Sequence, residues 1–194
     1  MNESIEFFQA FLKNPLKVGA IAPSSLELST KMLDGVIPDK NGILIELGPG
    51  TGAFTKQVYR EHHEAGSYLG IELDRKLITH LRSRYPSLKF VWGNATKAFK
   101  IHERSELGNA RYIISGLPFV SLPNDVNLKI YEEIEKFMEK GCMFRTFQYA
   151  HGYYMPSAVN LRKFMRTRYG VAEKSSLIIK NVPPAVTLTW STLS

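Results

Sequence analysis

The residues with the clearest chemical potential form a glycine-rich turn after a short apolar run. Residues 46–52 read Glu-Leu-Gly-Pro-Gly-Thr-Gly, after the apolar residues 43–45 and before a stretch with helical periodicity. Glycines at such a turn permit positive φ angles and let the backbone approach a ligand closely. In open α/β sheets, nucleotide-type ligands bind where the first strand ends. We therefore predict that Gly48, Gly50 and Gly52 bind a cofactor.

Two acidic residues accompany this turn. Glu72 lies 20 residues beyond Gly52, at the end of the next predicted strand, where a carboxylate can accept hydrogen bonds from both ribose hydroxyls. Gly48, Gly50 and Ala53 match a dinucleotide fingerprint, so NAD is one candidate. Glu46 favours S-adenosylmethionine instead, because a carboxylate is unfavourable beside a pyrophosphate and favourable near an ammonium and a sulfonium. A purely structural Glu46, bonded to nearby backbone N–H groups, is the alternative.

Two further turns complete the candidate site. Asn94 and Ala95 follow the third predicted strand, and the Asn94 amide oxygen can accept a hydrogen bond from an adenine amino group. The turn after the fourth strand contains Ser115, Leu117 and Pro118. Because Pro118 lacks an N–H and keeps Leu117 extended, backbone carbonyls there can point at a substrate amine. We predict Leu117 and Pro118 as substrate-binding and Ser115 as catalytic; ordinary turns are the structural alternative.

The elements that position these turns alternate along the chain. Apolar runs predict strands at residues 43–47, 68–71, 89–92, 110–115, 142–149, 174–180 and 185–192. Helical periodicity and caps predict helices at residues 24–34, 52–61, 75–84, 124–140 and 157–168. This alternation indicates a mostly parallel sheet with helices on both faces. We expect one domain over residues 1–194, with an amphipathic N-terminal helix at about residues 3–13.

Composition narrows the class of protein. The chain has 194 residues, with 25 Lys plus Arg against 18 Asp plus Glu and a formal charge of +7. Nucleic acid and anionic lipid are the usual partners of such a basic surface, and a basic soluble enzyme is the alternative. Cys142 is the single cysteine, which excludes a disulfide framework. Without a signal peptide or a spanning apolar run, we expect a cytoplasmic protein that associates peripherally with the inner face of the membrane.

The late part of the chain combines cations with aromatic rings. Its basic residues are Arg145, Arg162, Lys163, Arg166, Arg168, Lys174 and Lys180, with Glu173 as the only acid between residues 145 and 180. Cations bind lipid phosphate, and Tyr suits a polar–apolar boundary. We predict that Tyr149 and His151 hold the substrate amine or relay its proton, and that Tyr153 and Arg162 bind substrate. The same pattern would serve RNA, with a flipped base stacked on Tyr, and interfacial packing is the alternative for His151.

Four segments together resemble bacterial phospholipid N-methyltransferases, the small phosphatidylethanolamine-methylating enzymes. The segments are Asn14-Pro-Leu-Lys-Val-Gly-Ala-Ile-Ala-Pro-Ser-Ser25, Glu46 to Gly52, Ser115-Gly-Leu-Pro118 and Asn181-Val-Pro-Pro-Ala185. The resemblance spans nearly the whole chain, and the first and last segments are the more specific ones. More distantly, the layout is similar to ribosomal RNA adenine dimethylases. The chain departs from the family pattern at two places. Asn94 stands where Asp is usual, and residues 146–151 keep only the Tyr of the family's TYGP-like motif.

The resemblance implies a Rossmann-like class I methyltransferase fold, with a seven-stranded sheet and an antiparallel last strand. It implies S-adenosylmethionine as donor, S-adenosylhomocysteine as product, a lipid amine as acceptor and a cofactor-side role for the loop around Ile21. No metal and no obligate protein partner are expected. An ornithine-type aminolipid, ribosomal RNA adenine, or a catalytically silent binding module are the alternatives to phosphatidylethanolamine methylation.

Overall fold

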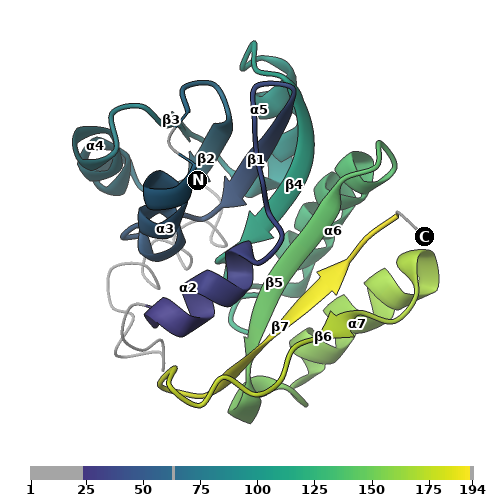
Figure 1. Ribbon diagram of the computed structural model, residues 1–194. Helices are drawn as coiled ribbons and strands as arrows, with labels where there is room; N and C mark the ends of the chain where they lie inside the picture. The colour runs from purple at the N-terminus through teal and green to yellow at the C-terminus, as the bar shows by residue number, and fades with distance from the viewer. Residues whose placement is uncertain (1–23, 63, 193–194) are drawn as a thin grey trace.

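The computed structural model describes residues 24–62 and 64–192 of the chain (Figure 1). The predicted helix at residues 3–13 and the candidate residue Ile21 lie outside these ranges. The strands are β1 (Gly42–Leu47), β2 (Tyr68–Glu72), β3 (Lys89–Trp92), β4 (Asn109–Ser115), β5 (Met143–Tyr149), β6 (Glu173–Lys174) and β7 (Ala185–Trp190). The α-helices are α2 (Leu26–Leu33), α3 (Ala53–Glu61), α4 (Arg75–Arg84), α5 (Ala98–Glu103), α6 (Asn124–Met138) and α7 (Pro156–Tyr169).

The seven strands form one sheet in the order β3-β2-β1-β4-β5-β7-β6. Strands β1 to β5 pair in parallel with one another, and β7 runs antiparallel to both β5 and β6. The predicted fold class is therefore confirmed. The strand order reverses between β1 and β4, since β1 continues to β2 on one side and β4 continues to β5 on the other. Ligands of open α/β sheets bind at such a reversal, outside the carboxyl ends of the strands.

Helices cover both faces of this sheet (Figure 1). Side chains of β1 alternate between two apolar clusters: Ile43 and Ile45 pack with α6 and α7, whereas Leu44 packs with α2, α3 and α4. All six residues of β1 are buried, as expected for a central parallel strand with helices on both sides. No helix of the described residues is long and apolar enough to cross a membrane.

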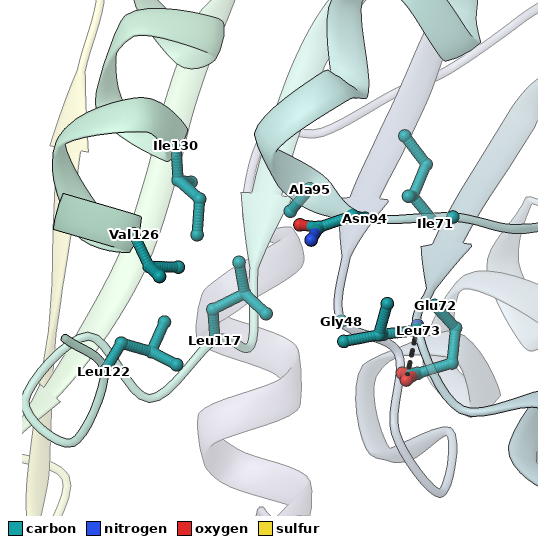
Figure 2. Close-up of a pocket in the computed structure, with 11 residues that line it drawn as sticks. Gly48, Ile71, Glu72, Leu73, Asn94, Ala95, Leu117, Leu122, Val126 and Ile130 are labelled. Carbon is teal, nitrogen blue, oxygen red and sulfur yellow. Dashed lines mark hydrogen bonds between the residues drawn. The ribbon is translucent and has the colours of Figure 1, made fainter. Parts of the chain in front are cut away.

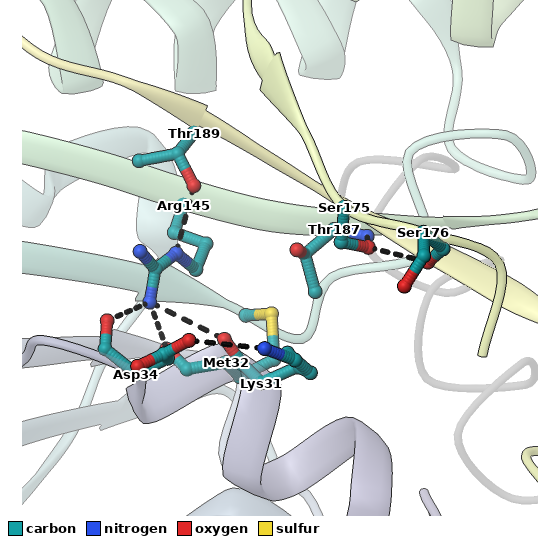
Figure 3. Close-up of polar contacts among 8 residues, drawn as sticks. All are labelled: Lys31, Met32, Asp34, Arg145, Ser175, Ser176, Thr187 and Thr189. Carbon is teal, nitrogen blue, oxygen red and sulfur yellow. Dashed lines mark hydrogen bonds and ion pairs between the residues drawn. The ribbon is translucent and has the colours of Figure 1, made fainter.

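Arg145 of β5 fastens α2 to the sheet (Figure 3). Its Nη1 donates hydrogen bonds to the backbone carbonyls of Lys31, Met32 and Asp34, at 3.3, 3.2 and 2.6 Å. Its Nε donates to Thr189 Oγ1 at 2.8 Å. A helix leaves its last carbonyls without internal partners, and a cation there also favours the helix dipole. Arg145 was predicted among the cations that face a lipid phosphate, and these contacts give it a structural role instead.

The predicted strand at residues 174–180 is shorter in the structure. Regular pairing stops after β6, and only an isolated bridge joins Ile178 to Ala185. Ser175 is the physical reason, because its hydroxyl accepts a hydrogen bond from the Thr187 N–H at 3.0 Å and donates one to the Ser176 carbonyl at 2.8 Å (Figure 3). A serine side chain that bonds backbone groups replaces part of the strand ladder.

Candidate active site

A cleft opens at the carboxyl ends of β1, β2 and β4 (Figure 2). The cleft and the solvent at its mouth together occupy about 440 Å³. Its lining residues are Gly48, Ile71, Glu72, Leu73, Gly93, Asn94, Ala95, Leu117, Leu122, Val126 and Ile130. Five of the residues predicted from sequence meet here: Gly48, Glu72, Asn94, Ala95 and Leu117. Strand pairing brings them together, since each follows or ends a neighbouring strand.

The glycine turn has the predicted left-handed backbone. The φ angles are +70° at Gly48, +59° at Gly50 and +88° at Gly52, where L side chains are strained. Gly48 has a second requirement, because a Cβ added there would lie 2.6 Å from Leu117 Cδ2. The turn after β1 therefore packs directly against the turn after β4. Gly48 lines the cleft, whereas Gly50 and Gly52 shape the turn behind it.

Glu72 closes the glycine turn from the end of β2. Its Oε2 accepts a hydrogen bond from the Gly50 N–H at 2.9 Å, and its Oε1 accepts from the N–H groups of Leu73 and Asp74 at 2.8 and 2.9 Å. Burial raises the pKa of Glu72, and these three hydrogen bonds oppose the rise. A carboxylate has about four acceptor positions, so about one, on Oε2, is open to a ligand. The carboxylate can therefore accept one ribose hydroxyl without losing an internal bond.

Glu46 is fully buried and lies behind the cleft rather than in its lining. Its Oε2 accepts hydrogen bonds from Thr55 Oγ1 at 2.8 Å and from the Tyr68 hydroxyl at 2.6 Å. Its Oε1 has no hydrogen-bond partner among the residues that the structure describes. Burial raises the pKa of Glu46 to about 7. The partners are side-chain hydroxyl groups on α3 and β2, not the backbone N–H groups that a structural role was expected to involve.

Asn94 directs its amide to the wall of the cleft (Figure 2). Its Oδ1 accepts a hydrogen bond from the Thr96 N–H at 3.0 Å, which caps the short 3-10 helix Ala95–Lys97. An amide oxygen has two lone pairs, so the cap leaves one for a ligand donor. The turn interpretation and the ligand interpretation of Asn94 are therefore compatible.

The turn after β4 is held by hydrogen bonds between its own residues. The Ser115 hydroxyl accepts a hydrogen bond from the Leu117 N–H at 3.2 Å and is fully buried. The Pro118 carbonyl accepts from the N–H groups of Ser121 and Leu122, at 2.8 and 3.2 Å. Leu117 lines the cleft and Pro118 does not. The contacts of Ser115 are those of a residue that shapes the turn, and its predicted catalytic role and the binding role of Pro118 stay predictions.

Four further residues predicted on the acceptor side lie outside the lining of the cleft: Tyr149 ends β5, His151 and Tyr153 follow it before α7, and Arg162 lies in α7. The rings of Tyr149 and His151 are stacked, with centroids 5.6 Å apart. Arg162 Nη1 donates hydrogen bonds to Gln148 Oε1 at 2.5 Å and to the Tyr153 carbonyl at 2.8 Å, and its guanidinium lies 3.9 Å from the centre of the Tyr153 ring. The structure thus brings these residues together as two pairs, and their roles toward a substrate stay predictions.

Comparisons with known proteins agree on one class of enzyme. No family model matches the chain. It is 24% identical over 141 residues to an ornithine lipid N-methyltransferase of Singulisphaera acidiphila, which covers 71% of this chain and 73% of that protein. It is 24% identical over 145 residues to the ribosomal RNA small subunit methyltransferase A of Chlorobium chlorochromatii, a match that covers 75% of this chain but only about half, 52%, of that relative.

Solved structures give the same fold. An RNA methyltransferase from Salinibacter ruber, solved with S-adenosyl-L-homocysteine, matches with a TM-score of 0.56 and 18% identity, over 88% of this chain and 93% of that one. With the sequence relatives, this decides the class. The chain is an S-adenosylmethionine-dependent methyltransferase with a Rossmann-like fold. The predicted enzyme class and methyl donor are therefore confirmed, whereas the acceptor is not fixed by these matches.

Sequence reasoning missed part of the lining of this methyltransferase. Leu73 follows Glu72 directly, so the end of β2 was the signal that pointed to it. Val126 and Ile130 lie one helical turn apart on α6, and Leu122 lies in the loop before that helix. Apolar residues at that spacing are equally typical of a core face, so no local signal distinguishes them. Only the packing of α6 against α5, β5 and the 3-10 helix Ala95–Lys97 places them in the cleft.

Proposed function

We propose that this methyltransferase transfers a methyl group from S-adenosylmethionine to the amine of a membrane lipid. The proposed acceptor is phosphatidylethanolamine, and an ornithine-type aminolipid is the alternative. The observation that carries the proposal is the match to the ornithine lipid N-methyltransferase, which extends over most of both chains. The described residues and the cleft supply the physical support.

The cleft suits the proposed donor. Apolar side chains of Ile71, Leu73 and Ile130 line it and fit a flat heterocycle, with the Asn94 amide within the same wall. Glu72 supplies an acceptor position for a ribose hydroxyl. The unpartnered Oε1 of Glu46, behind the glycine turn, is a buried polar atom that a cationic ligand group would stabilise. When bound, S-adenosylmethionine supplies an electrophilic methyl group on its sulfonium.

Residues of the chain must prepare the amine, which is protonated in water at neutral pH. Desolvation disfavours the charged amine and so helps it to lose its proton. Tyr149 and His151, stacked at the end of β5, are proposed to hold the amine and accept or relay that proton. An aromatic face of Tyr149 would stabilise the fixed cation that repeated methylation produces, since the Tyr153 ring already contacts the Arg162 guanidinium. Holding the two reactants in line is the main contribution of the site.

Methylation of ribosomal RNA adenine is the second candidate, because five further relatives and the Chlorobium protein carry that name. A flipped base needs an accessible aromatic face on which to stack. Phe119, the ring nearest the turn after β4, is only 4% exposed and packs on Tyr131 with centroids 5.5 Å apart. Phe119 is therefore not available to a base, whereas Tyr154 is 85% exposed. The lipid acceptor is favoured because the match covers 73% of the ornithine lipid relative and only 52% of the Chlorobium relative.

Radiolabelled methyl transfer separates the candidates. The enzyme is incubated with methyl-labelled S-adenosylmethionine and, in parallel, with phosphatidylethanolamine vesicles, ornithine-lipid vesicles and unmethylated ribosomal RNA. We expect label in a lipid fraction and none in RNA. The Glu72→Ala variant serves as the cofactor-deficient control. Label in RNA alone would overturn the lipid proposal, and label in no acceptor would favour a catalytically silent module.

A further inference from the structure

Two segments at the carboxyl edge of the sheet expose large apolar side chains. Tyr154 is 85% exposed, and Ile179 and Val182 are each 71% exposed. Met155 and Leu177 are nearly half exposed, at 46% and 48%. We call these five residues, Tyr154, Met155, Leu177, Ile179 and Val182, the apolar rim. Soluble proteins expose single apolar residues routinely, but a contiguous group marks an interaction surface.

Hydrogen bonds and ring contacts join the two segments of the rim. The Ala150 N–H donates to the Pro184 carbonyl at 2.8 Å, which fixes the start of one segment to the end of the other. Lys174 Nζ lies 5.3 Å from the centre of the Tyr153 ring. In Figure 1, the turn between β6 and β7 and the beginning of α7 lie at the same end of the molecule. The two segments that carry the rim are therefore joined to each other, although they are far apart in the sequence.

The rim borders the catalytic end of the molecule. A Cβ added at Gly152 would lie 3.7 Å from Val120 Cγ2, so the segment before Tyr154 touches the loop that follows Leu117. Leu117 lines the cleft. A ligand whose headgroup reaches the turn after β4 while its apolar tails stay outside the cleft would extend over this edge.

Charge selects the kind of partner. Between residues 150 and 184, Glu173 is the only acid, and the cations nearest the rim in sequence are Lys174 and Lys180. Arg162 bonds Gln148 and the Tyr153 carbonyl, and Arg168 pairs with Glu135, so these two arginines contribute to the fold. Lys180 lies between Ile179 and Val182, so a cation sits within the rim itself. Exposed apolar and Tyr side chains interspersed with Lys are typical of surfaces that enter the interface of an anionic bilayer. Lys is depleted at protein–protein interfaces, so a Lys among the rim residues favours a lipid surface over a protein partner.

We infer that the apolar rim inserts into the surface of an anionic lipid bilayer and holds the cleft against it. This inference rests on the proposed lipid acceptor, and it assigns the membrane contact to residues 150–155 and to the turn between β6 and β7, residues 175–184. Tyr suits the polar–apolar boundary, while the aliphatic residues reach the acyl region. Lys180 and Lys174 then meet lipid phosphates at the same depth.

The test is cosedimentation with vesicles of phosphatidylglycerol and phosphatidylcholine, which contain no primary amine acceptor. The triple variant Tyr154→Ser, Ile179→Ser, Val182→Ser is compared with Val171→Ser. Val171 is 78% exposed but follows the far end of α7, a helix of 14 residues and thus about 21 Å long. We expect the triple variant to bind at least tenfold more weakly and Val171→Ser to bind like the wild type.

Several outcomes overturn the inference. Absence of wild-type binding does so, as does equal binding by the triple variant. If the wild type is a dimer, the triple variant is a monomer and neither protein binds vesicles, the rim is an interface between two copies of the chain. The proposed function is judged separately: methyl transfer to a short-chain, water-soluble lipid amine should be the same for the triple variant and the wild type. If no lipid amine is methylated but binding still depends on the rim, the rim stands and only the acceptor is wrong.

Discussion

The Asn181 side chain accepts a hydrogen bond from the backbone N–H of Ser25, at 2.8 Å and across 156 residues of chain. Its Nδ2 also donates to the Pro183 carbonyl at 2.7 Å, and the residue is only 2% exposed. Ser25 is the N-cap of α2. The two sequence segments that are most specific for the family resemblance, one ending at Ser25 and one beginning at Asn181, therefore meet in space.

Replacing Asn181 with Ala should destabilise the protein by about 1–3 kcal/mol, because the Ser25 N–H and the Pro183 carbonyl lose a buried partner. Urea unfolding measures the loss. Asn160→Ala, at an exposed position of α7, is the matched control and should change stability little. Equal stability of the two variants would show that the link between the segments contributes nothing.

Removing the Glu72 carboxylate should weaken cofactor binding while the fold survives. The residue joins β2 to the glycine turn through Gly50 and keeps an open acceptor position toward the cleft. Titration calorimetry with S-adenosylhomocysteine should show at least a tenfold loss of affinity for Glu72→Ala, or about 1.4 kcal/mol. The exposed Glu103→Ala, at the end of α5, should bind as the wild type does. Unchanged affinity of Glu72→Ala would remove the ribose role.

Gly48→Ala should be more damaging than Gly66→Ala, although both glycines have positive φ angles. At Gly66 nothing lies within 4 Å of an added Cβ, so only backbone strain of about 1 kcal/mol is expected. At Gly48 the new Cβ would lie 2.6 Å from Leu117 Cδ2 and 3.3 Å from Leu117 Cγ, so the Leu117 side chain, which lines the cleft, must shift. We expect a further loss of about 1–3 kcal/mol in urea unfolding and a measurable loss of S-adenosylhomocysteine binding. Equal effects at the two sites would refute the contact.

The stability of the cofactor-free protein should fall as the pH rises through the titration range of Glu46. Burial raises its pKa from 4.5 to about 7, so between these values the folded state holds a proton that the unfolded state has released. Stability from this group is therefore fully present below about pH 4.5, decreases up to about pH 7 and is level above it. The total loss is at most about 3 kcal/mol.

The Glu46→Gln variant tests this assignment, because its amide cannot ionise. Its unfolding free energy should change less between pH 5 and pH 8 than that of the wild type. The raised pKa of Glu72 acts in the same direction and is present in both proteins, so the difference between them reports Glu46. A parallel pH dependence in the two proteins would mean that Glu46 is ionised throughout this range.

Local sequence determined most of the helices and strands. The predicted helix at residues 75–84 is α4 itself, because Asp74 caps its first turn by accepting a hydrogen bond from the Lys76 N–H at 2.7 Å. The strand predicted at residues 89–92 and the positive φ angles predicted for the glycine turn after β1 also depend on local sequence, and both are present in the structure. Helix α5 was not predicted, since a six-residue helix has little periodicity of its own. Its Phe99 N–H donates to Glu133 Oε2 at 2.8 Å, a contact that only the packing of α6 provides.

By itself the sequence determined the fold class and the cofactor turn, because backbone freedom at glycine, helix caps and apolar periodicity act between near neighbours. Tertiary structure decided which charged groups are available to a ligand. Nothing in the local sequence shows that Glu46 and Arg145 have internal partners. In the structure, Glu46 accepts hydrogen bonds from Tyr68 and Thr55, and Arg145 donates to carbonyls at the end of α2. Burial and hydrogen-bond partners depend on elements brought together from distant parts of the chain, so no local pattern encodes them.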